Sequence, residues 1–309
     1  MRITKERSVE SQQKQDRDAA KPSVPALLWL MPKLPNAAPV SALPRPIDLA
    51  YPSNRVAVVA TLAFGAATLL LGRGWRQALG VSGAAFVGWA SGRELDPDFP
   101  LSASLALGLA GVAALGQTER GNPQTAPAVL PGFAALSAVR ILSATVGHPV
   151  SPQDAAALSA QAGIAALAGY RTPALLPAAA LALSGTQPDA LRPEASWSAP
   201  AALGAGLLPT LKRTSAHERP RQIFADLLSL AALSLTRQIT APELPDSHCD
   251  LVPIRVSASR LQASRALSLG TLALGLLRRE SSSLVPLAAA CLGTGLRRSL
   301  EWKEGGQSS

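Results

Sequence analysis

The sequence has few aromatic residues and only two cysteines. Phe, Trp and Tyr make up 4% of its 309 residues, although apolar residues together make up 48%. A soluble core of this size ordinarily uses more large side chains, whereas helices in a membrane pack closely through small residues. Cys249 and Cys291 form neither a disulfide framework nor the spacing of a zinc site. The composition therefore favours helices in lipid over a soluble, disulfide-rich or zinc-bound domain.

Motifs of the common enzyme classes are also absent. The chain has no phosphate-binding P-loop, no GxGxxG after a strand, no HExxH pair and no GxSxG nucleophile elbow. Lysine is scarce as well: 23 of the 29 basic residues are arginines. Arginine in place of lysine, together with abundant Ala, Leu and Gly, is typical of a GC-rich bacterial genome. We therefore predict a bacterial protein and lean towards a function that is not enzymatic.

The net charge of +9 and the pI of about 10.4 could indicate nucleic-acid binding. That function requires a basic face interleaved with aromatic side chains. Here the arginines lie mostly at the ends of apolar runs, where they suit lipid headgroups and membrane topology. We predict the lipid bilayer, and not nucleic acid, as the partner.

Apolar segments fill most of the chain after residue 54. They are residues 56–72, 77–92, 101–117, 127–147, 155–170, 172–186, 197–211, 222–239, 265–277 and 281–296. These predict an all-α, polytopic transmembrane bundle of about ten short helices arranged as hairpins. Most segments are shorter than the roughly 20 residues of a full span, and mean hydropathy is only +0.20. Tryptophans near segment ends are typical of a membrane interface, and they are Trp75, Trp89, Trp197 and Trp302.

Charge alternates from loop to loop. The loops after the first, third, fifth, seventh and ninth segments hold ten basic and three acidic residues, whereas the loops between them hold six basic and nine acidic. A bilayer with a positive-inside bias sorts charge in this way. The rule places the basic loops in the cytoplasm and both termini outside, although the basic N-terminal tail conflicts with that orientation.

The two ends of the chain differ from the middle. Residues 1–54 are polar and then proline-rich, a composition that predicts a disordered tail. Met31 is the only other methionine and an alternative start. We assign residues 55–303 to the membrane-embedded domain and residues 304–309 to a short C-terminal tail.

The acidic loop after the second segment is the first candidate site. Glu94, Asp96 and Asp98 occupy alternate positions, and in an extended stretch alternate side chains point the same way. Their oxygens suit Mg²⁺ or another divalent cation. A solvated loop that ends the helix is the competing interpretation.

Arg140 is the second candidate, because it lies within an apolar segment where a charge is costly and usually faces the bundle interior. We predict that it pairs with Asp226 in a later segment. Alternatively, Arg140 lies nearer an interface and extends its guanidinium towards water.

The stretch from Asp246 to Asp250 is the third candidate. His248 with its flanking aspartates could ligate zinc, and Cys249 could be a nucleophile. No second histidine is close in sequence, so we favour the interpretation that this stretch is an ordinary loop without a zinc or thiol site.

Two function classes remain open. The first is a non-enzymatic bundle in the bacterial cytoplasmic membrane, either a small-solute transporter or a membrane scaffold, and a homo-oligomer is compatible with it. The second is a metal-dependent enzyme that acts on a lipid or polyprenyl substrate through Glu94, Asp96 and Asp98. The first is favoured because transport needs no catalytic motif. Proximity of Arg140 to the acidic loop would favour a shared site for an anionic ligand.

Overall fold

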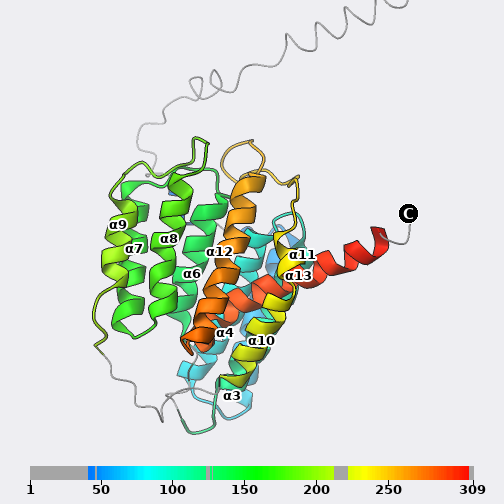
Figure 1. Cartoon of the computed structure of the whole chain (residues 1–309). Coiled ribbons are helices and arrows are strands. Elements are labelled where there is room, and N and C mark those ends of the chain that lie inside the picture. The colour runs from blue at the N-terminus through cyan, green and yellow to red at the C-terminus, as the bar shows by residue number, and fades with distance from the viewer. Residues whose placement is uncertain (1–40, 46, 123–125, 127, 212–221, 306–309) are drawn as a thin grey trace, which may run out of the picture. The chain divides into compact units, whose positions relative to one another are not determined.

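A computed structural model describes residues 41–45, 47–122, 126, 128–211 and 222–305, with side chains up to residue 300 (Figure 1). These residues form helices and no β-strands. The α-helices are α3 (Pro52–Leu70), α4 (Trp75–Leu95), α5 (Pro100–Gln117), α6 (Val129–Ser143), α7 (Pro152–Leu167), α8 (Arg171–Gly185), α9 (Ser198–Gly206), α10 (Ile223–Ser234), α11 (Thr236–Thr240), α12 (Ala258–Leu277) and α13 (Val285–Gly305). A short 3₁₀ helix, η3 (Ser281–Leu284), precedes α13.

The predicted all-α class is confirmed. Nine of the ten predicted segments contain one α-helix each, and the segment 222–239 contains α10 and α11, which are divided at Leu235. Several helices extend beyond the apolar runs. α4 includes Arg93 and Glu94, α12 begins before Arg260, and α13 continues past Arg297.

Successive helices run in opposite directions. Every second loop between helices lies at one end of the bundle, where hydrogen bonds join the loops. For example, Arg120 donates to the carbonyl of Leu71, and Gln222 donates to the carbonyl of Arg279. Ion pairs join the remaining connections at the other end, which we call the ion-pair end. The two sets of loops are the ones that differ in charge in the sequence.

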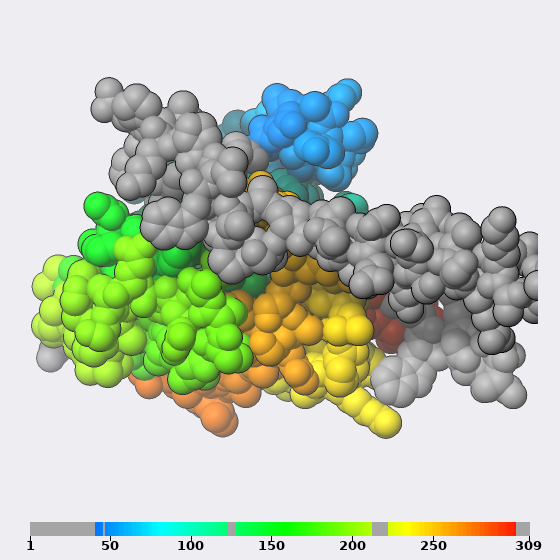
Figure 2. Space-filling model, turned by 90° about the horizontal axis from the view of Figure 1, so that it is seen from above, coloured from blue at the N-terminus to red at the C-terminus, as the bar shows by residue number. Residues whose placement is uncertain are grey.

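Figure 1 shows α9, α7, α8 and α6 side by side, followed by α12, with α13 crossing obliquely. α13 packs against α4, α5 and α10. Figure 2 looks onto the end drawn uppermost in Figure 1, where green residues of α7 to α9, orange residues of α12 and yellow residues near α10 follow one another.

Small side chains allow close helix packing. A Cβ atom on Gly88 would lie 2.6 Å from the Cβ of Ala110 and 2.9 Å from the carbonyl oxygen of Ala106. A Cβ atom on Gly92 would lie 2.8 Å from the Cα of Ala103. The Gly88-x-x-x-Gly92 pair on α4 therefore brings its backbone against α5, as small-x-x-x-small motifs do in membrane helices.

Two of the described helices are long and apolar enough to cross a membrane, α3 and α5. Only 17% of the apolar window of α3 is buried, compared with 50% for α5. The helices α6 and α10 are apolar but shorter, at 15 and 12 residues. The ten-span bundle is thus not confirmed, and the finding is an all-helical bundle with two helices of spanning length.

The N-terminal boundary lies earlier than predicted. A compact unit begins at Ser41, so residues 41–54, assigned above to the tail, belong to the helical unit. We call residues 41–45 and 47–50 the strap. The predicted disorder of residues 1–40, the alternative start at Met31 and residues 306–309 lie outside the described residues, and α13 extends to Gly305.

The close approach of α4 to α5 predicts that Gly88→Ala lowers the free energy of unfolding by about 1–3 kcal/mol, because the added methyl group has no space. Gly108→Ala on α5 is the matched control, since no atom lies within 4 Å of the position that its Cβ would take. We expect Gly108→Ala to be neutral or to stabilise by up to about 1 kcal/mol. Thermal unfolding of the purified variants measures both, and equal losses would contradict the close packing.

Candidate functional site

A fully buried carboxylate lies at the end of α4. Glu94 has no exposed side-chain surface, and its Oε1 accepts a hydrogen bond of 2.8 Å from Nε of Arg140 on α6. Its Oε2 accepts a hydrogen bond from the hydroxyl of Thr145. A buried carboxylate remains charged only with such partners. The Arg140 to Glu94 contact therefore joins the ends of α4 and α6.

The strap adds a second arginine to Glu94. Nη1 of Arg45 lies 3.5 Å from Oε1 of Glu94, while its Nε and Nη2 bind the carboxylate of Asp250 at 2.6 and 2.7 Å. Nη1 of Arg140 also donates to the carbonyl of Leu43, at 2.6 Å. The strap is thus held on the ends of α4 and α6 by both arginines.

The strap is also fixed at its first residues. The buried carboxylate of Asp154, near the start of α7, accepts hydrogen bonds from the hydroxyl of Ser41 and the amide of Ala42, and also from Ser151. Asp154 therefore serves two purposes, because it caps α7 and anchors the strap.

A third arginine lies one residue before Glu94. The guanidinium of Arg93 stacks 5.3 Å from the ring centre of Trp89, one turn earlier on α4, and donates to the side chain of Asn54 at 3.2 Å. Trp89 is 4% exposed and lines a cavity. The interfacial position of this tryptophan stays a prediction; its side chain faces the protein interior, whereas Trp75 and Trp197 are exposed.

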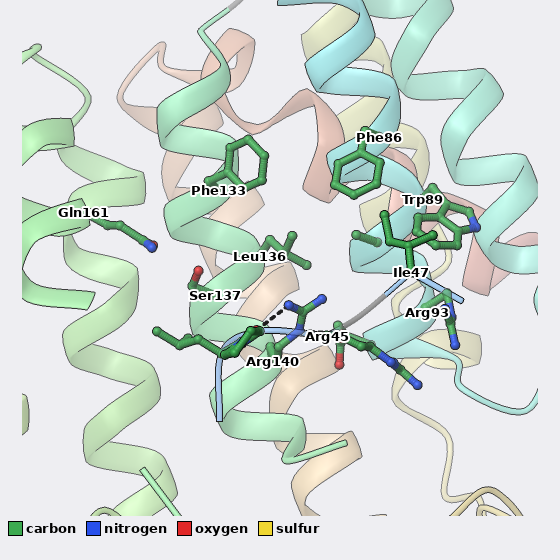
Figure 3. A pocket seen from close by; sticks show the side chains of 14 residues that line it. Arg45, Ile47, Phe86, Trp89, Arg93, Phe133, Leu136, Ser137, Arg140 and Gln161 are labelled. Carbon is green, nitrogen blue, oxygen red and sulfur yellow. Dashed lines mark hydrogen bonds and ion pairs between the residues drawn. The ribbon is translucent and has the colours of Figure 1, made fainter. Parts of the chain in front are cut away.

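These arginines lie at one side of a cavity of about 360 Å³ between α4, α6, α7 and the strap (Figure 3). Two helices supply most of its wall at equivalent positions. α4 contributes Phe86, Trp89, Ala90 and Arg93, and α6 contributes Phe133, Leu136, Ser137 and Arg140. Both sets have the spacing i, i+3, i+4, i+7, which places four side chains on one helix face.

The lining of the cavity is net positive. Its ionisable residues are Arg45, Arg93, Arg140 and the single carboxylate Glu94, so the charges sum to +2. Nη1 of Arg45 is buried without a hydrogen-bond partner. Buried donors of a guanidinium ordinarily have acceptors. The arrangement can accept a negatively charged group beside Arg45.

A separate ion-pair cluster joins α4 to α12 and α13. Asp96 binds Arg297 through two hydrogen bonds of 2.6 and 3.0 Å and lies 3.5 Å from Arg265. Glu243 accepts from Arg265 at 2.8 Å and from Arg298 at 2.6 Å. These pairs connect the end of α4, inner positions of α12 and α13, and the loop that precedes α12.

Arg260 on α12 is another fully buried charge. Its guanidinium binds both oxygens of Asp189 at 2.6 and 2.7 Å and donates to the hydroxyl of Ser184 at 2.9 Å. The hydrogen bonds from Arg260 lower the pKa of Asp189 below its ordinary value. The pair therefore remains charged at neutral pH and ties α12 to the end of α8.

The three predicted metal ligands do not converge on one another. Glu94 faces Arg140, Asp96 faces Arg297, and Asp98 accepts hydrogen bonds from the amides of Asp246 and Ser247. Within the described part of the chain, no group of three His, Cys, Asp or Glu side chains could hold a metal ion. The Mg²⁺ site at Glu94, Asp96 and Asp98 remains a prediction without structural support.

Arg140 and Asp226 do not pair with each other as predicted, because each has a different partner. Arg140 binds Glu94 at the ion-pair end, whereas Asp226 lies in the first turn of α10 at the opposite end and accepts from the hydroxyl of Ser281. Arg140 therefore lies beside Glu94, the first of the three acidic residues, which is the proximity that favours a shared site for an anionic ligand.

The 246–250 stretch provides no reactive thiol. Burial raises the pKa of Cys249 to about 11, and its Sγ lies 3.5 Å from the carbonyl oxygen of Ala144. A thiol with this pKa is protonated at neutral pH and is a poor nucleophile. His248 is exposed and pairs through its backbone with Arg255.

Arg45, Arg93 and the aromatic residues of the cavity were not predicted from the sequence. Arg45 lies in the proline-rich stretch that we assigned to the tail. The other residues have a sequence signal, because F-x-x-W-A-x-x-R in α4 and F-x-x-L-S-x-x-R in α6 place phenylalanine and arginine at identical spacing. Comparison with known families, curated proteins and solved structures found no match to this chain.

Glu94→Gln is predicted to lower the free energy of unfolding by about 3–5 kcal/mol, because it leaves Arg45 and Arg140 without their shared buried countercharge. Asp246→Asn is the matched control at the same end. Its side chain is 89% exposed, so we expect a change within about 0.5 kcal/mol. Chemical denaturation of both variants tests this, and similar losses would contradict a structural role for Glu94.

Proposed function

We propose that the chain is a polytopic protein of a bacterial cytoplasmic membrane that binds a small organic anion in the arginine-lined cavity, as a transporter does, without catalysing a reaction. The observation that carries the proposal is the cavity itself: three arginines and one carboxylate, with a buried Arg45 nitrogen that has no hydrogen-bond partner.

The outer helix faces support the membrane environment. Large apolar side chains are exposed along α3 and α10, among them Val59, Leu62, Leu69, Leu227 and Leu230. Contiguous exposed apolar surface is uncommon on soluble monomers and marks contact with lipid or protein. The middle of every helix from α3 to α10 is uncharged. Arg265 on α12 and Arg297 on α13 lie well inside their helices, but both are buried in ion pairs with Asp96 and Glu243, so lipid would not have to accommodate them.

Only the longer helices match a bilayer in length, since α9 has nine residues and extends about 14 Å. At about 1.5 Å per residue, the 21 residues of α4 extend about 31 Å, close to the hydrocarbon thickness of about 30 Å. The 15 residues of α8 extend only about 22 Å, which requires local thinning of the bilayer or burial by neighbouring helices. The basic loops lie at the end opposite the ion pairs, which favours a cytoplasmic location for that end.

The cavity supports anion binding more than metal-dependent catalysis. Each carboxylate of the acidic loop has arginine or backbone partners, which leaves no described group of ligands for a catalytic cation. The arginines exceed the carboxylates around the cavity, and a guanidinium binds carboxylate and phosphate groups with particular strength. A pure scaffold would not require this excess of buried positive charge.

Thermal unfolding of the full chain in neutral detergent tests anion binding with inorganic phosphate as the probe. Phosphate at ten times its dissociation constant is expected to stabilise the protein by about 1.4 kcal/mol. That gain corresponds to a rise in Tm of roughly 2–5 °C relative to chloride at equal ionic strength.

Two variants that each remove one positive charge show where phosphate binds. Arg45→Gln is expected to abolish the phosphate-dependent rise, because it removes a positive charge and the Nη1 donor that is ion-paired to Glu94 but has no hydrogen-bond partner. Arg255→Gln is the control, since this arginine lies at the same end with 66% of its side chain exposed. A phosphate effect of equal size in both variants, or none in the wild-type protein, would overturn the proposal.

A further inference from the structure

The cavity has two chemically different parts. Phe86 and Phe133 face one another across it, and each lies seven residues before an arginine of the same helix (Figure 3). Both helices end at the ion-pair end, so seven residues, at about 1.5 Å each, place the two rings about 10 Å deeper in the bundle than Arg93 and Arg140. The deep part is therefore apolar, and the positive part lies near the helix ends.

The positive part also adjoins a second cavity. This polar cleft of about 470 Å³ shares Pro44, Arg45, Trp89 and Arg93 with the first cavity, and its other side is lined by Asp48, Asn54, His248 and Asp250. A charged group held at Arg45 would thus have polar surroundings on one side and aromatic side chains on the other. The second cavity is also lined by the carboxylates of Asp48, Asp96 and Asp250, so it offers a free inorganic anion no net positive surroundings.

The side-chain Oε1 of Gln161 is also buried and has no hydrogen-bond partner. It reaches the cavity from α7, opposite the wall formed by α4 (Figure 3). Unpartnered buried polar atoms are uncommon in folded proteins. Oε1 of Gln161 is an acceptor, so it can bind a hydroxyl or amide group of a ligand, whereas the donors for an anionic headgroup come from Arg45 and Arg140.

We propose that the ligand is a single-chain amphiphile with a phosphate or carboxylate headgroup, taken from the membrane. The headgroup binds Arg45 and Arg140, and the chain lies between Phe86 and Phe133. This inference rests on the proposed function and adds the apolar tail. The cavity volume lies at the lower end of the range for small-molecule sites. It therefore holds the headgroup and the first part of a chain, and the remainder extends along the apolar helices.

Titration calorimetry of the full-length protein in neutral detergent can compare hexyl phosphate, inorganic phosphate and hexanol. Hexyl phosphate is expected to bind at least tenfold more tightly than inorganic phosphate, and hexanol is expected to give no saturable binding. Ile47→Ser changes an apolar wall residue that is 40% exposed and makes little contribution to folding. This variant and Phe133→Ala should each weaken hexyl phosphate binding and leave inorganic phosphate unaffected.

Phe224→Ala on α10 is the matched control, because this phenylalanine is half-exposed and lies outside the cavity lining. Equal affinities for hexyl phosphate and inorganic phosphate would overturn the proposed amphiphile and leave anion binding in place. The same conclusion would follow if Phe224→Ala and Phe133→Ala lost equal affinity for hexyl phosphate while Ile47→Ser lost none. Failure of both phosphates to bind would overturn the proposed function itself.

Discussion

The burial of Glu94 between two arginines is the interaction on which the ion-pair end depends. A carboxylate removed from water is tolerated only with countercharges and hydrogen bonds, and Arg140, Arg45 and Thr145 supply them from three different parts of the chain. The same requirement recurs at Asp96 with Arg297 and at Asp189 with Arg260. Charged residues such as Glu94, Arg260 and Arg297 thus extend the helices instead of ending them, because each has a partner on a neighbouring helix or in a connection between helices.

The positions of the helices could be predicted from the sequence, but the charged residues that pair with one another could not. Runs of Ala, Leu and Gly predicted the number of helices, and the alternation of charge predicted which loops share an end. The predicted bounds of α4, α12 and α13 were too short, because arginines and carboxylates at those positions resemble loop residues. Glu94 and Arg140 are 46 residues apart, so neither composition nor periodicity indicates that they meet.

The strap illustrates the same limit. Its proline-rich composition is typical of a disordered tail, yet a few specific contacts through Arg45 and Ser41 fix it to carboxylates of the helical unit. These contacts also complete the wall of the cavity. Arg45 shares Glu94 with Arg140, and its Nη1, 3.5 Å from Glu94, makes an ion pair without a hydrogen bond, which is the feature on which the proposed anion site rests.

Cysteine labelling in native membranes tests most directly whether lipid surrounds the uncharged band of this bundle. In a Cys249→Ala, Cys291→Ala background, single cysteines would replace Leu62 on α3 and Leu227 on α10, which are 67% and 58% exposed, and Gly74 and Leu244 at opposite ends. A membrane-impermeant maleimide should label Gly74→Cys and Leu244→Cys from opposite sides, and Leu62→Cys and Leu227→Cys only after unfolding. Labelling of the Leu62 and Leu227 positions at the rate of Leu244→Cys would contradict the account.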